Sequence, residues 1–183
     1  MISLIILGII FLYAIISYNT LTRKRNNVDN AFGSIDVMLK KRFDLIPNLV
    51  ATVQQYAKHE EETFTKITNL RTKSYDSLTA EEKADFDKTF TAAKNNFFMV
   101  AENYPALRSS ENFMQLQKTL NETEEQLSAS RRTYNAAVTD YNNSVMTFPS
   151  YIIPNLFSFT KKEVFAIPEE EKVNPDVKKL FRS

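Results

Sequence analysis

The sequence MISLIILGIIFLYAIISYNTLT occupies residues 1–22 and carries no charged side chain. Its apolar run from Ile2 to Tyr18 has about the length that a helix needs to cross a hydrocarbon layer roughly 30 Å thick. Such a layer offers no water to main-chain polar groups, so a single spanning segment must be helical. We therefore predict that residues 1–22 form a transmembrane anchor and that a lipid bilayer is a partner of the chain.

Two other interpretations of this stretch compete with an anchor: a cleavable signal peptide and a buried core helix. A signal peptide has a basic segment before its apolar run and a small-residue cleavage site after it, and this stretch has neither. A core helix is usually amphipathic, whereas this stretch is apolar all round. Both comparisons favour a retained anchor.

Three basic residues, Arg23, Lys24 and Arg25, follow the apolar run directly, and no Lys or Arg precedes it. Positively charged residues that flank a spanning helix tend to stay on the cytoplasmic side of the membrane. We therefore predict a single-pass protein of the cell membrane, with its N-terminus outside and the bundle in the cytoplasm. The three basic side chains are expected to attract anionic lipid headgroups, each contributing about 1 kcal/mol.

Composition excludes several classes of protein. Only two glycines occur among 183 residues, which disfavours the glycine-dependent turns of hairpins, dinucleotide-binding loops and P-loops. The absence of cysteine excludes disulfides, thiolate nucleophiles and Cys-ligated zinc. A net charge of +1 gives no electrostatic reason to expect nucleic acid as a partner. The composition indicates an all-helical protein with one domain beyond the anchor.

The helical pattern continues beyond the anchor to about residue 43. Apolar side chains recur there every three or four positions and predict one buried stripe; they are Val28, Phe32, Ile35, Leu39 and Phe43. Asp44 can cap a new helix, and Pro47 costs least within a first turn. A break near Asp44 and a second helix over residues 45–74 are therefore favoured, and a single helix kinked at Pro47 is the alternative.

Two further helices are predicted after residue 74. Thr79 and Glu82 form a capping box, and the helix that they begin ends at Pro105. The last helix opens at Ser109 or Ser110 and has apolar residues every seven positions, as in a coiled-coil seam: Phe113, Leu120, Leu127, Tyr134, Tyr141 and Phe148. Short connections favour antiparallel neighbours. The predicted fold is all-α, with the anchor continuing into an elongated, up-and-down, antiparallel bundle of four helices over residues 23–148.

The remaining part, residues 149–183, is predicted to hold an apolar segment followed by an irregular tail. The apolar segment either covers one end of the bundle or contacts the membrane or another subunit, since exposed apolar patches mark such sites. The candidate contact residues are Tyr151, Ile152, Ile153, Leu156, Phe157 and Phe159. Tyr-Asn pairs recur at residues 18–19, 134–135 and 141–142. They either form a shared polar layer or use tyrosine as an apolar filler whose hydroxyl reaches the rim.

Two long segments resemble the bacterial LemA family. They are YNTLTRKRNNVDNAFGSIDVMLKKRFDLIPNLVATVQQYAKHE, residues 18–60, and ENYPALRSSENFMQLQKTLNETEEQLSASRRTYNAAVTDYNNSVMTFP, residues 102–149. Phe32 stands where the family pattern usually has tryptophan, which keeps an aromatic side chain there. The resemblance implies a single N-terminal membrane helix, an antiparallel helical bundle and no established enzymatic activity. It also suggests an envelope-associated partner such as a membrane metalloprotease.

No catalytic or metal-binding arrangement and no cofactor is predicted from the residues. His59-Glu60 lacks the second histidine of an H-E-x-x-H zinc site, because the chain has a single histidine. A G-x-S-x-G nucleophile elbow is also absent. A second basic run, Lys40, Lys41 and Arg42, is interpreted as forming inter-helix or inter-subunit pairs, or as solvated.

The sequence thus favours a membrane-anchored helical scaffold that forms a homo-oligomer, rather than an enzyme. The succession Phe97-Phe98-Met99-Val100 indicates an apolar stripe wide enough to leave a face for neighbouring copies. An adaptor or regulator that binds an envelope protease or another membrane protein is the alternative.

Overall fold

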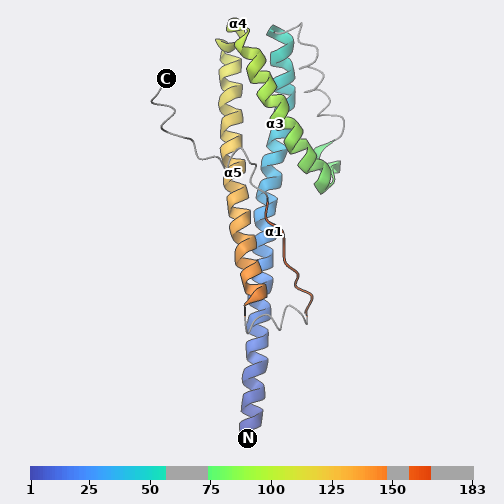
Figure 1. Cartoon of the computed structure of the whole chain (residues 1–183), viewed down its shortest axis with the longest axis vertical. Helices are drawn as coiled ribbons and strands as arrows, with labels where there is room; N and C mark the ends of the chain where they lie inside the picture. Colours follow the sequence, from blue (N-terminus) through green and yellow to red (C-terminus); the bar gives the residue numbers. More distant parts are fainter. Residues whose placement is uncertain (57–73, 148–156, 166–183) are drawn as a thin grey trace, which may run out of the picture. The chain divides into compact units, whose positions relative to one another are not determined.

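The computed structural model describes residues 1–56, 74–147 and 157–165. Over these ranges the structure contains helices and no strand: α1 (Ile2–Tyr56), the 3₁₀ turn η1 (Tyr75–Ser77), α3 (Ala80–Glu102), α4 (Pro105–Arg108) and α5 (Glu111–Met146) (Figure 1). The predicted all-α class is confirmed. Most of the expected second helix, from residue 57 to 73, lies outside the described residues.

The predicted break near Asp44 is wrong, because α1 continues through Pro47 as one helix. A proline inside a helix costs about 3 kcal/mol. The residues on either side of it offset this cost, since Phe43, Ile46 and Leu49 are all buried on one face of α1. Burying each such side chain contributes about 1.5–3 kcal/mol. Continuing the helix keeps these three side chains in register, and a new helix axis at Asp44 would separate them.

The residues group by their contacts into two compact units. Unit 1 consists of Met1–Asp29 and Thr133–Ser183, and unit 2 consists of Asn30–Arg132. Both α1 and α5 therefore contribute residues to each unit. The sequence predicts a different division, into residues 1–22, 23–148 and 149–183. That division is based on membrane crossing and composition rather than on contacts, and it stays a prediction.

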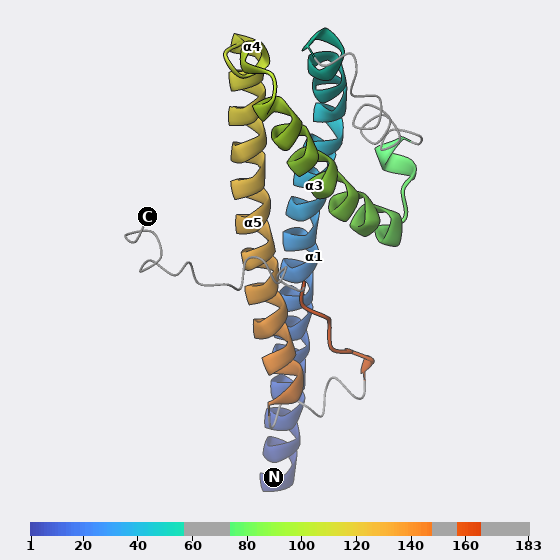
Figure 2. The same cartoon turned by 45° about the horizontal axis from the view of Figure 1, so that its top comes forward.

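Unit 2 is a helical bundle whose ion pairs establish the helix directions. Asp36 pairs with Lys83 and Arg42 pairs with Asp87, so the numbers rise together and α1 runs parallel to α3. Asp87 also pairs with Arg131, whereas Lys94, further along α3, pairs with the earlier Glu124, so α5 runs antiparallel to α3. The short helix α4 makes the reversal between α3 and α5 (Figure 2).

The sequence signals for α3 are confirmed in unit 2. The Thr79 hydroxyl accepts a hydrogen bond from the Glu82 amide at 3.2 Å, and the Glu82 carboxylate accepts one from the Thr79 amide at 2.8 Å. The apolar stripe of α3 is buried, with Phe86 packed 5.6 Å, centroid to centroid, from Phe43 of α1. Tyr75 of η1 lies 5.7 Å from the same Phe43 ring. An aromatic cluster therefore joins α1, η1 and α3.

The seven-residue repeat of α5 is confirmed at four of its six predicted positions, while Tyr134 is half-buried and Phe148 lies outside the described residues. Phe113, Leu120 and Leu127 are buried in unit 2, and Tyr141 is buried in unit 1. The stripe of α1 differs from prediction at one position, because Phe32 is 42% exposed and its neighbour Ala31 is buried instead. Both positions lie about one turn from the neighbouring stripe residues, so periodicity alone does not choose between them.

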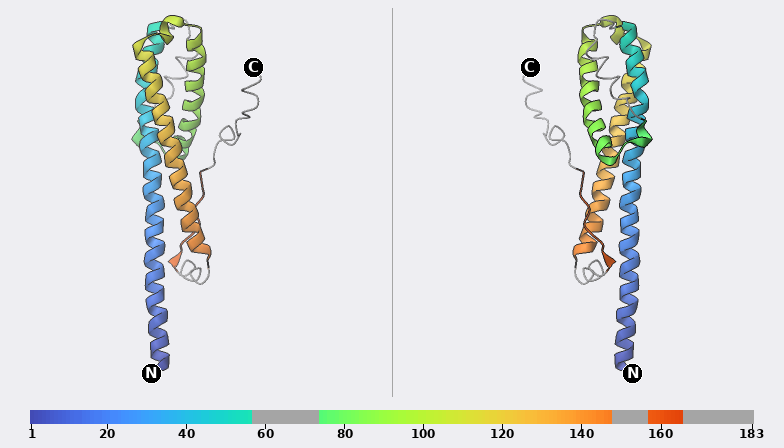
Figure 3. Two further views of the ribbon diagram at one scale, coloured as in Figure 1. Left: turned by 90° about the vertical axis from the view of Figure 1, so that its left-hand side faces the viewer. Right: turned by 90° about the vertical axis from the view of Figure 1, so that its right-hand side faces the viewer.

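Unit 1 combines the first part of α1, the last part of α5 and an extended segment, residues 157–165, that lies beside them (Figure 3). A small core holds it together, formed by Leu21, Val28, Val138, Tyr141 and Phe159. The start of α1 contributes little to this core, since only 6% of its most apolar window is buried while the mean hydropathy there is 2.2. This N-terminal apolar helix is long enough to cross a membrane and is compatible with a single-pass anchor.

Candidate functional site

The extended segment of unit 1, residues 157–165, is called the strap. Phe159 inserts into the core of unit 1 and is only 7% exposed. Tyr18 of α1 meets two strap rings edge to face, Phe157 at 5.0 Å and Phe159 at 5.7 Å between centroids. Ser158 between them has a positive φ of 56°, a backbone conformation that is uncommon for a residue other than glycine. The aromatic contacts hold the start of the strap against α1.

Two asparagines of α5, seven residues apart, bind the main chain of the strap in the same way. The Asn142 amide donates to the Lys162 carbonyl at 2.8 Å and accepts from the Lys162 amide at 3.0 Å. The Asn135 amide donates to the Phe165 carbonyl at 3.0 Å and accepts from the Phe165 amide at 2.8 Å. Each asparagine thus satisfies both main-chain polar groups of one strap residue, as a neighbouring strand would in a sheet.

Two tyrosines that precede these asparagines complete the arrangement. The Tyr141 hydroxyl donates to the Thr160 carbonyl at 2.9 Å, and the Tyr134 hydroxyl donates to the Glu163 carbonyl at 3.1 Å. Burial raises the pKa of Tyr141 by more than the Arg25 charge lowers it. Burial also raises the pKa of Tyr134, with a contribution from the Asp29 charge. Both phenols therefore stay protonated near neutral pH and act as donors. Together the four α5 residues are called the Tyr–Asn ladder: Tyr134, Asn135, Tyr141 and Asn142.

The spacing of the ladder matches that of an extended chain. Seven residues of a helix rise about 10.5 Å. The strap residues bound by equivalent side chains are three apart, Thr160 and Glu163 for the tyrosines and Lys162 and Phe165 for the asparagines. Three residues of extended chain cover about 10 Å. The strap therefore runs antiparallel to α5 and meets one Tyr-Asn pair for every three of its own residues.

The predicted membrane-flanking residues lie next to the strap. Arg23 is exposed, whereas Lys24 forms an ion pair with Asp140 of α5 at 2.7 Å. The Arg25 guanidinium lies 5.2 Å from the centre of the Phe159 ring. An ion pair between Lys162 of the strap and Asp29 of α1 adds a further link. Two of the three basic side chains thus have partners within unit 1, and their lipid contact stays a prediction.

Of the six candidate membrane or subunit contact residues, Phe157 and Phe159 lie within the described residues. Phe157 is 51% exposed, in contrast to the buried Phe159. Tyr151, Ile152, Ile153 and Leu156 lie outside the described residues. The contact role assigned to this set stays a prediction.

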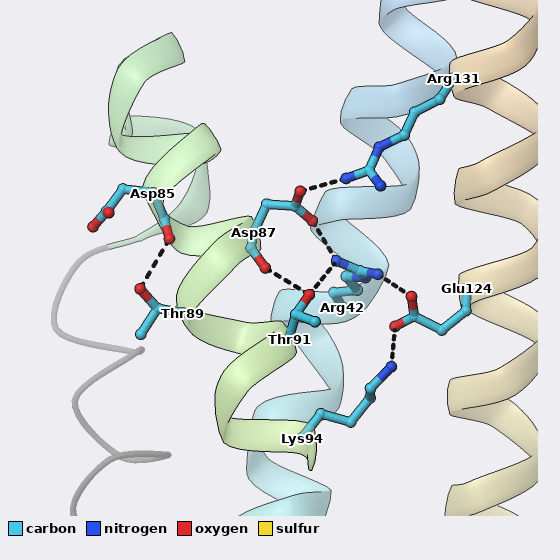
Figure 4. Close-up of polar contacts among 8 residues, drawn as sticks. All are labelled: Arg42, Asp85, Asp87, Thr89, Thr91, Lys94, Glu124 and Arg131. Atoms are coloured by element: carbon cyan, nitrogen blue, oxygen red, sulfur yellow. Dashed lines mark hydrogen bonds and ion pairs between the residues drawn. The ribbon is translucent and has the colours of Figure 1, made fainter. Parts of the chain in front are cut away.

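Unit 2 contains a buried ionic network centred on Arg42 (Figure 4). The Arg42 side chain is only 2% exposed, and its guanidinium forms ion pairs with Asp87 of α3 and Glu124 of α5. Arg131 pairs with the other oxygen of Asp87, and Lys94 lies 3.1 Å from Glu124. Removing one partner from such a network leaves charges uncompensated in a poorly solvated site. The network links α1, α3 and α5 within unit 2.

Of the basic run at residues 40–42, Arg42 thus forms inter-helix pairs. Lys41 donates to Gln126 of α5 at 3.2 Å, and Lys40 lies 3.9 Å from Asp44 on the same helix. The sequence did contain a signal for the network. Arg42 falls one turn after Leu39 on the buried stripe, and Glu124 falls one turn after Leu120 on the α5 seam, so both charges occupy apolar positions.

A second polar cluster joins α1, η1 and α3. The Tyr75 hydroxyl donates to Asp36 at 2.7 Å, and Lys83 pairs with the same carboxylate at 2.7 Å. Burial acts to raise the pKa of Asp36, but the hydrogen bonds from Lys83 and Tyr75, with the Lys83 charge, hold this pKa below its usual value. Burial, followed by the hydrogen bond to Asp36, raises the pKa of Tyr75.

In the part of the chain that the structure describes, no three His, Cys, Asp or Glu side chains are grouped so that they could bind a metal ion. His59 and Glu60 lie outside that part.

Sequence comparison identifies the family. The sequence model of the LemA family matches residues 31–178, which include most of unit 2 and both Tyr-Asn pairs of α5. The chain belongs to the LemA family. The resemblance seen in the sequence is thereby confirmed.

Relatives of this LemA-family chain include Protein LemA of Metamycoplasma hominis, which is 26% identical over 179 residues, or 95% of this chain and 80% of the relative. The magnetosome proteins MamQ 1 and MamQ 2 of Paramagnetospirillum magneticum are each 22% identical over 174 residues. That alignment covers 81% of this chain and 64% of each magnetosome protein, so the chain spans less than two thirds of their length.

The Tyr–Asn ladder was only half visible in the sequence of this LemA-family chain. The seven-residue spacing of the pairs at 134–135 and 141–142 indicates a shared polar feature on one helix face. The other half of the ladder is the main chain of the strap. Because every residue except proline carries the same main-chain donor and acceptor, no residue type marks that partner in the sequence.

Proposed function

We propose that this LemA-family protein is a non-enzymatic scaffold, anchored in the cell membrane by α1, that self-associates there. The observation that carries the proposal is the apolar start of α1, which is exposed and continues without interruption into residues of both units. Membership of the LemA family and similarity to magnetosome proteins fit a membrane-associated helical protein.

Self-association is supported by the confinement of anchored copies and by apolar side chains that face outward. Anchors hold the copies in one layer and so raise their effective concentration. Outside the anchor, Met99 of α3 is 66% exposed although Phe97 and Phe98 beside it pack against Phe113. The non-enzymatic part of the proposal is supported by the charges of unit 2, since Arg42, Asp87 and Glu124 are occupied in pairing with one another or with their neighbours.

The oligomeric state tests this function directly. Full-length protein extracted in detergent is measured by light scattering over a range of concentrations. A mass of two or more copies is expected, and a strictly monomeric species at every concentration would rule out self-association.

The orientation is proposed from the same flanking charges, with the N-terminus outside and the bundle in the cytoplasm. Positive residues occur only after the apolar run, at Arg23, Lys24 and Arg25. Because the chain has no cysteine, the exposed Lys88 of α3 is replaced in a Lys88→Cys variant and treated with a membrane-impermeant maleimide. Labelling is expected only after lysis, and labelling in intact cells would reverse the orientation.

The same membranes test whether the protein is instead an adaptor or regulator of an envelope protease or other membrane protein. Chemical cross-linking in native membranes should recover links between copies of this chain. A dominant link to one heterologous membrane protein would replace the scaffold function with the adaptor function.

A further inference from the structure

The Tyr–Asn ladder binds the main chain of the strap, and one ring contact adds to this, because the Tyr134 ring lies 5.4 Å, centroid to centroid, from the Phe165 ring. Six hydrogen bonds join it to main-chain carbonyls or amides of the strap, at Thr160, Lys162, Glu163 and Phe165. Main-chain recognition of an extended peptide gives affinity without demanding a particular sequence, as when a strand is added to a sheet edge. The ladder is therefore a peptide-binding surface built on a helix, and the strap is its occupant.

We propose that in the assembled protein the ladder of one copy binds the strap, residues 157–165, of a second copy, so that neighbouring copies exchange straps. The inference rests on the self-association proposed above and assigns a contact to it. In this arrangement each copy donates one strap and receives another, with the hydrogen bonds described for a single chain.

The surroundings of the ladder favour a strap over an unrelated peptide. One end of the ladder adjoins the apolar site for Phe159, which Leu21, Val28 and Val138 line and over which Arg25 lies. Three residues further along the strap, Lys162 pairs with Asp29. An occupant therefore needs an aromatic residue followed three positions later by a cation. The strap has this pattern, and every copy of the chain supplies it.

Exchange retains all of these contacts, which is why swapping an identical element between copies has a low energetic cost. Residues 147–156 join the strap to α5, and ten residues can span up to about 33 Å when extended. By length alone, this connection does not confine the strap to its own copy. Anchors that hold copies in one layer raise the local concentration of straps around each ladder.

Site-directed cross-linking distinguishes exchange from binding within one chain. One full-length copy carries Asp29→Cys and a second, differently tagged copy carries Lys162→Cys, and the two are produced together in membranes. Since the natural chain has no cysteine, a short bismaleimide can link only these two positions. A product that carries both tags is expected. A third copy with Lys88→Cys in place of Asp29→Cys controls for random collision and should give no such product.

The ladder itself is tested in the copy that carries Asp29→Cys. Adding Asn135→Ala and Asn142→Ala removes four hydrogen bonds to the strap and should lower the yield of two-tag product about tenfold, equivalent to about 1.4 kcal/mol. Asn121 and Asn143 are exposed asparagines of the same helix, so Asn121→Ala with Asn143→Ala is the matched control and should leave the yield unchanged. Tyr141→Phe is a milder ladder variant that should give a smaller decrease.

Two cross-linking results overturn the inference, and light scattering shows whether self-association fails with it. An Asp29→Cys, Lys162→Cys double variant that links only within one chain, without two-tag product, shows that the strap stays with its own copy. If light scattering still shows an oligomer, self-association survives and only strap exchange fails. If it shows a monomer, both proposals fail together. A two-tag yield that is unchanged by the ladder substitutions also overturns the inference, because the copies would then meet by another surface.

Discussion

Units 1 and 2 are both built on residues of α1 and α5, yet the largest polar cluster of each is paired in a different way. Unit 2 pairs charged side chains with one another, with the buried Arg42 between carboxylates of two other helices. Unit 1 pairs neutral side chains of the Tyr–Asn ladder with the main chain of the strap. The ion pairs of the first arrangement require particular residues on both sides, whereas the hydrogen bonds of the second require them on the ladder side only.

This difference has consequences for stability and for exchange. Buried charges without partners are costly, so the network of unit 2 favours one arrangement of its helices. Hydrogen bonds to an extended main chain are individually worth about 1 kcal/mol and are satisfied by any copy of the strap. Unit 2 is therefore expected to behave as a fixed bundle, and unit 1 as the place where an element can be exchanged.

The largest effect is expected from Arg42→Ala in unit 2. It leaves Asp87 and Glu124 without their shared buried partner, although Arg131 and Lys94 still compensate part of the charge. The free energy of unfolding of unit 2 should fall by about 3 kcal/mol in denaturant titrations. Lys41→Ala removes an exposed positive charge next to it and should cost less than about 1 kcal/mol. Equal losses in the two variants would contradict a specific role for the network.

A substitution at Pro47 tests why α1 is continuous. Pro47→Ala restores a main-chain donor and removes the steric clash with the preceding turn, so unit 2 should become more stable by about 2 kcal/mol. Thermal unfolding should show a higher midpoint. A less stable unit 2 in this variant would contradict the prediction. It would mean that the backbone geometry at Pro47 is needed to bury Ile46 and Leu49.

Substitutions in the Tyr–Asn ladder should destabilise unit 1 alone. Asn135→Ala combined with Asn142→Ala should weaken the binding of the strap by about 1.4 kcal/mol, since four neutral hydrogen bonds are exchanged for bonds to water. Hydrogen exchange at the Lys162 and Phe165 amides should accelerate, while that of α3 in unit 2 should not change. Accelerated exchange throughout α3 would show that the two kinds of polar contact are not independent.

The smallest effect is expected from pH. The pKa of Asp36 is lowered in the folded state, so this carboxylate stabilises unit 2 above its unfolded pKa of about 3.9, and the contribution is lost as the pH falls below that value. Because the side chain is 38% exposed, screening limits the loss to less than about 1 kcal/mol. The raised pKa of Tyr75 has the opposite consequence, a loss of stability as the pH rises above about 10.

Denaturant midpoints measured from pH 3 to pH 11 should therefore fall at both ends of the range. Asp36→Asn should flatten the acid side specifically. If the denaturant midpoint of Asp36→Asn falls at low pH as much as that of the natural protein, other carboxylates cause the loss of stability in acid.

Much of the fold follows from local and periodic features of the sequence. The apolar start of α1, the capping box at Thr79 and the seven-residue repeat of α5 all depend on residues within one helix, and the structure contains each of them. Pro47 is an exception, because a local rule predicted a break that burial on both sides of the proline overrides. The choice between Ala31 and Phe32 likewise depended on the partner helices.

The sequence by itself determined an all-helical chain with an apolar N-terminal helix and a place in the LemA family. Only the tertiary structure decided which groups meet. Arg42 reaches Glu124 across 82 positions of the chain, and helix periodicity within either segment carries no information about that pairing. The strap was beyond sequence reasoning for a different reason: its polar main-chain groups are common to nearly all residues, and only folding brings them opposite the Tyr–Asn ladder.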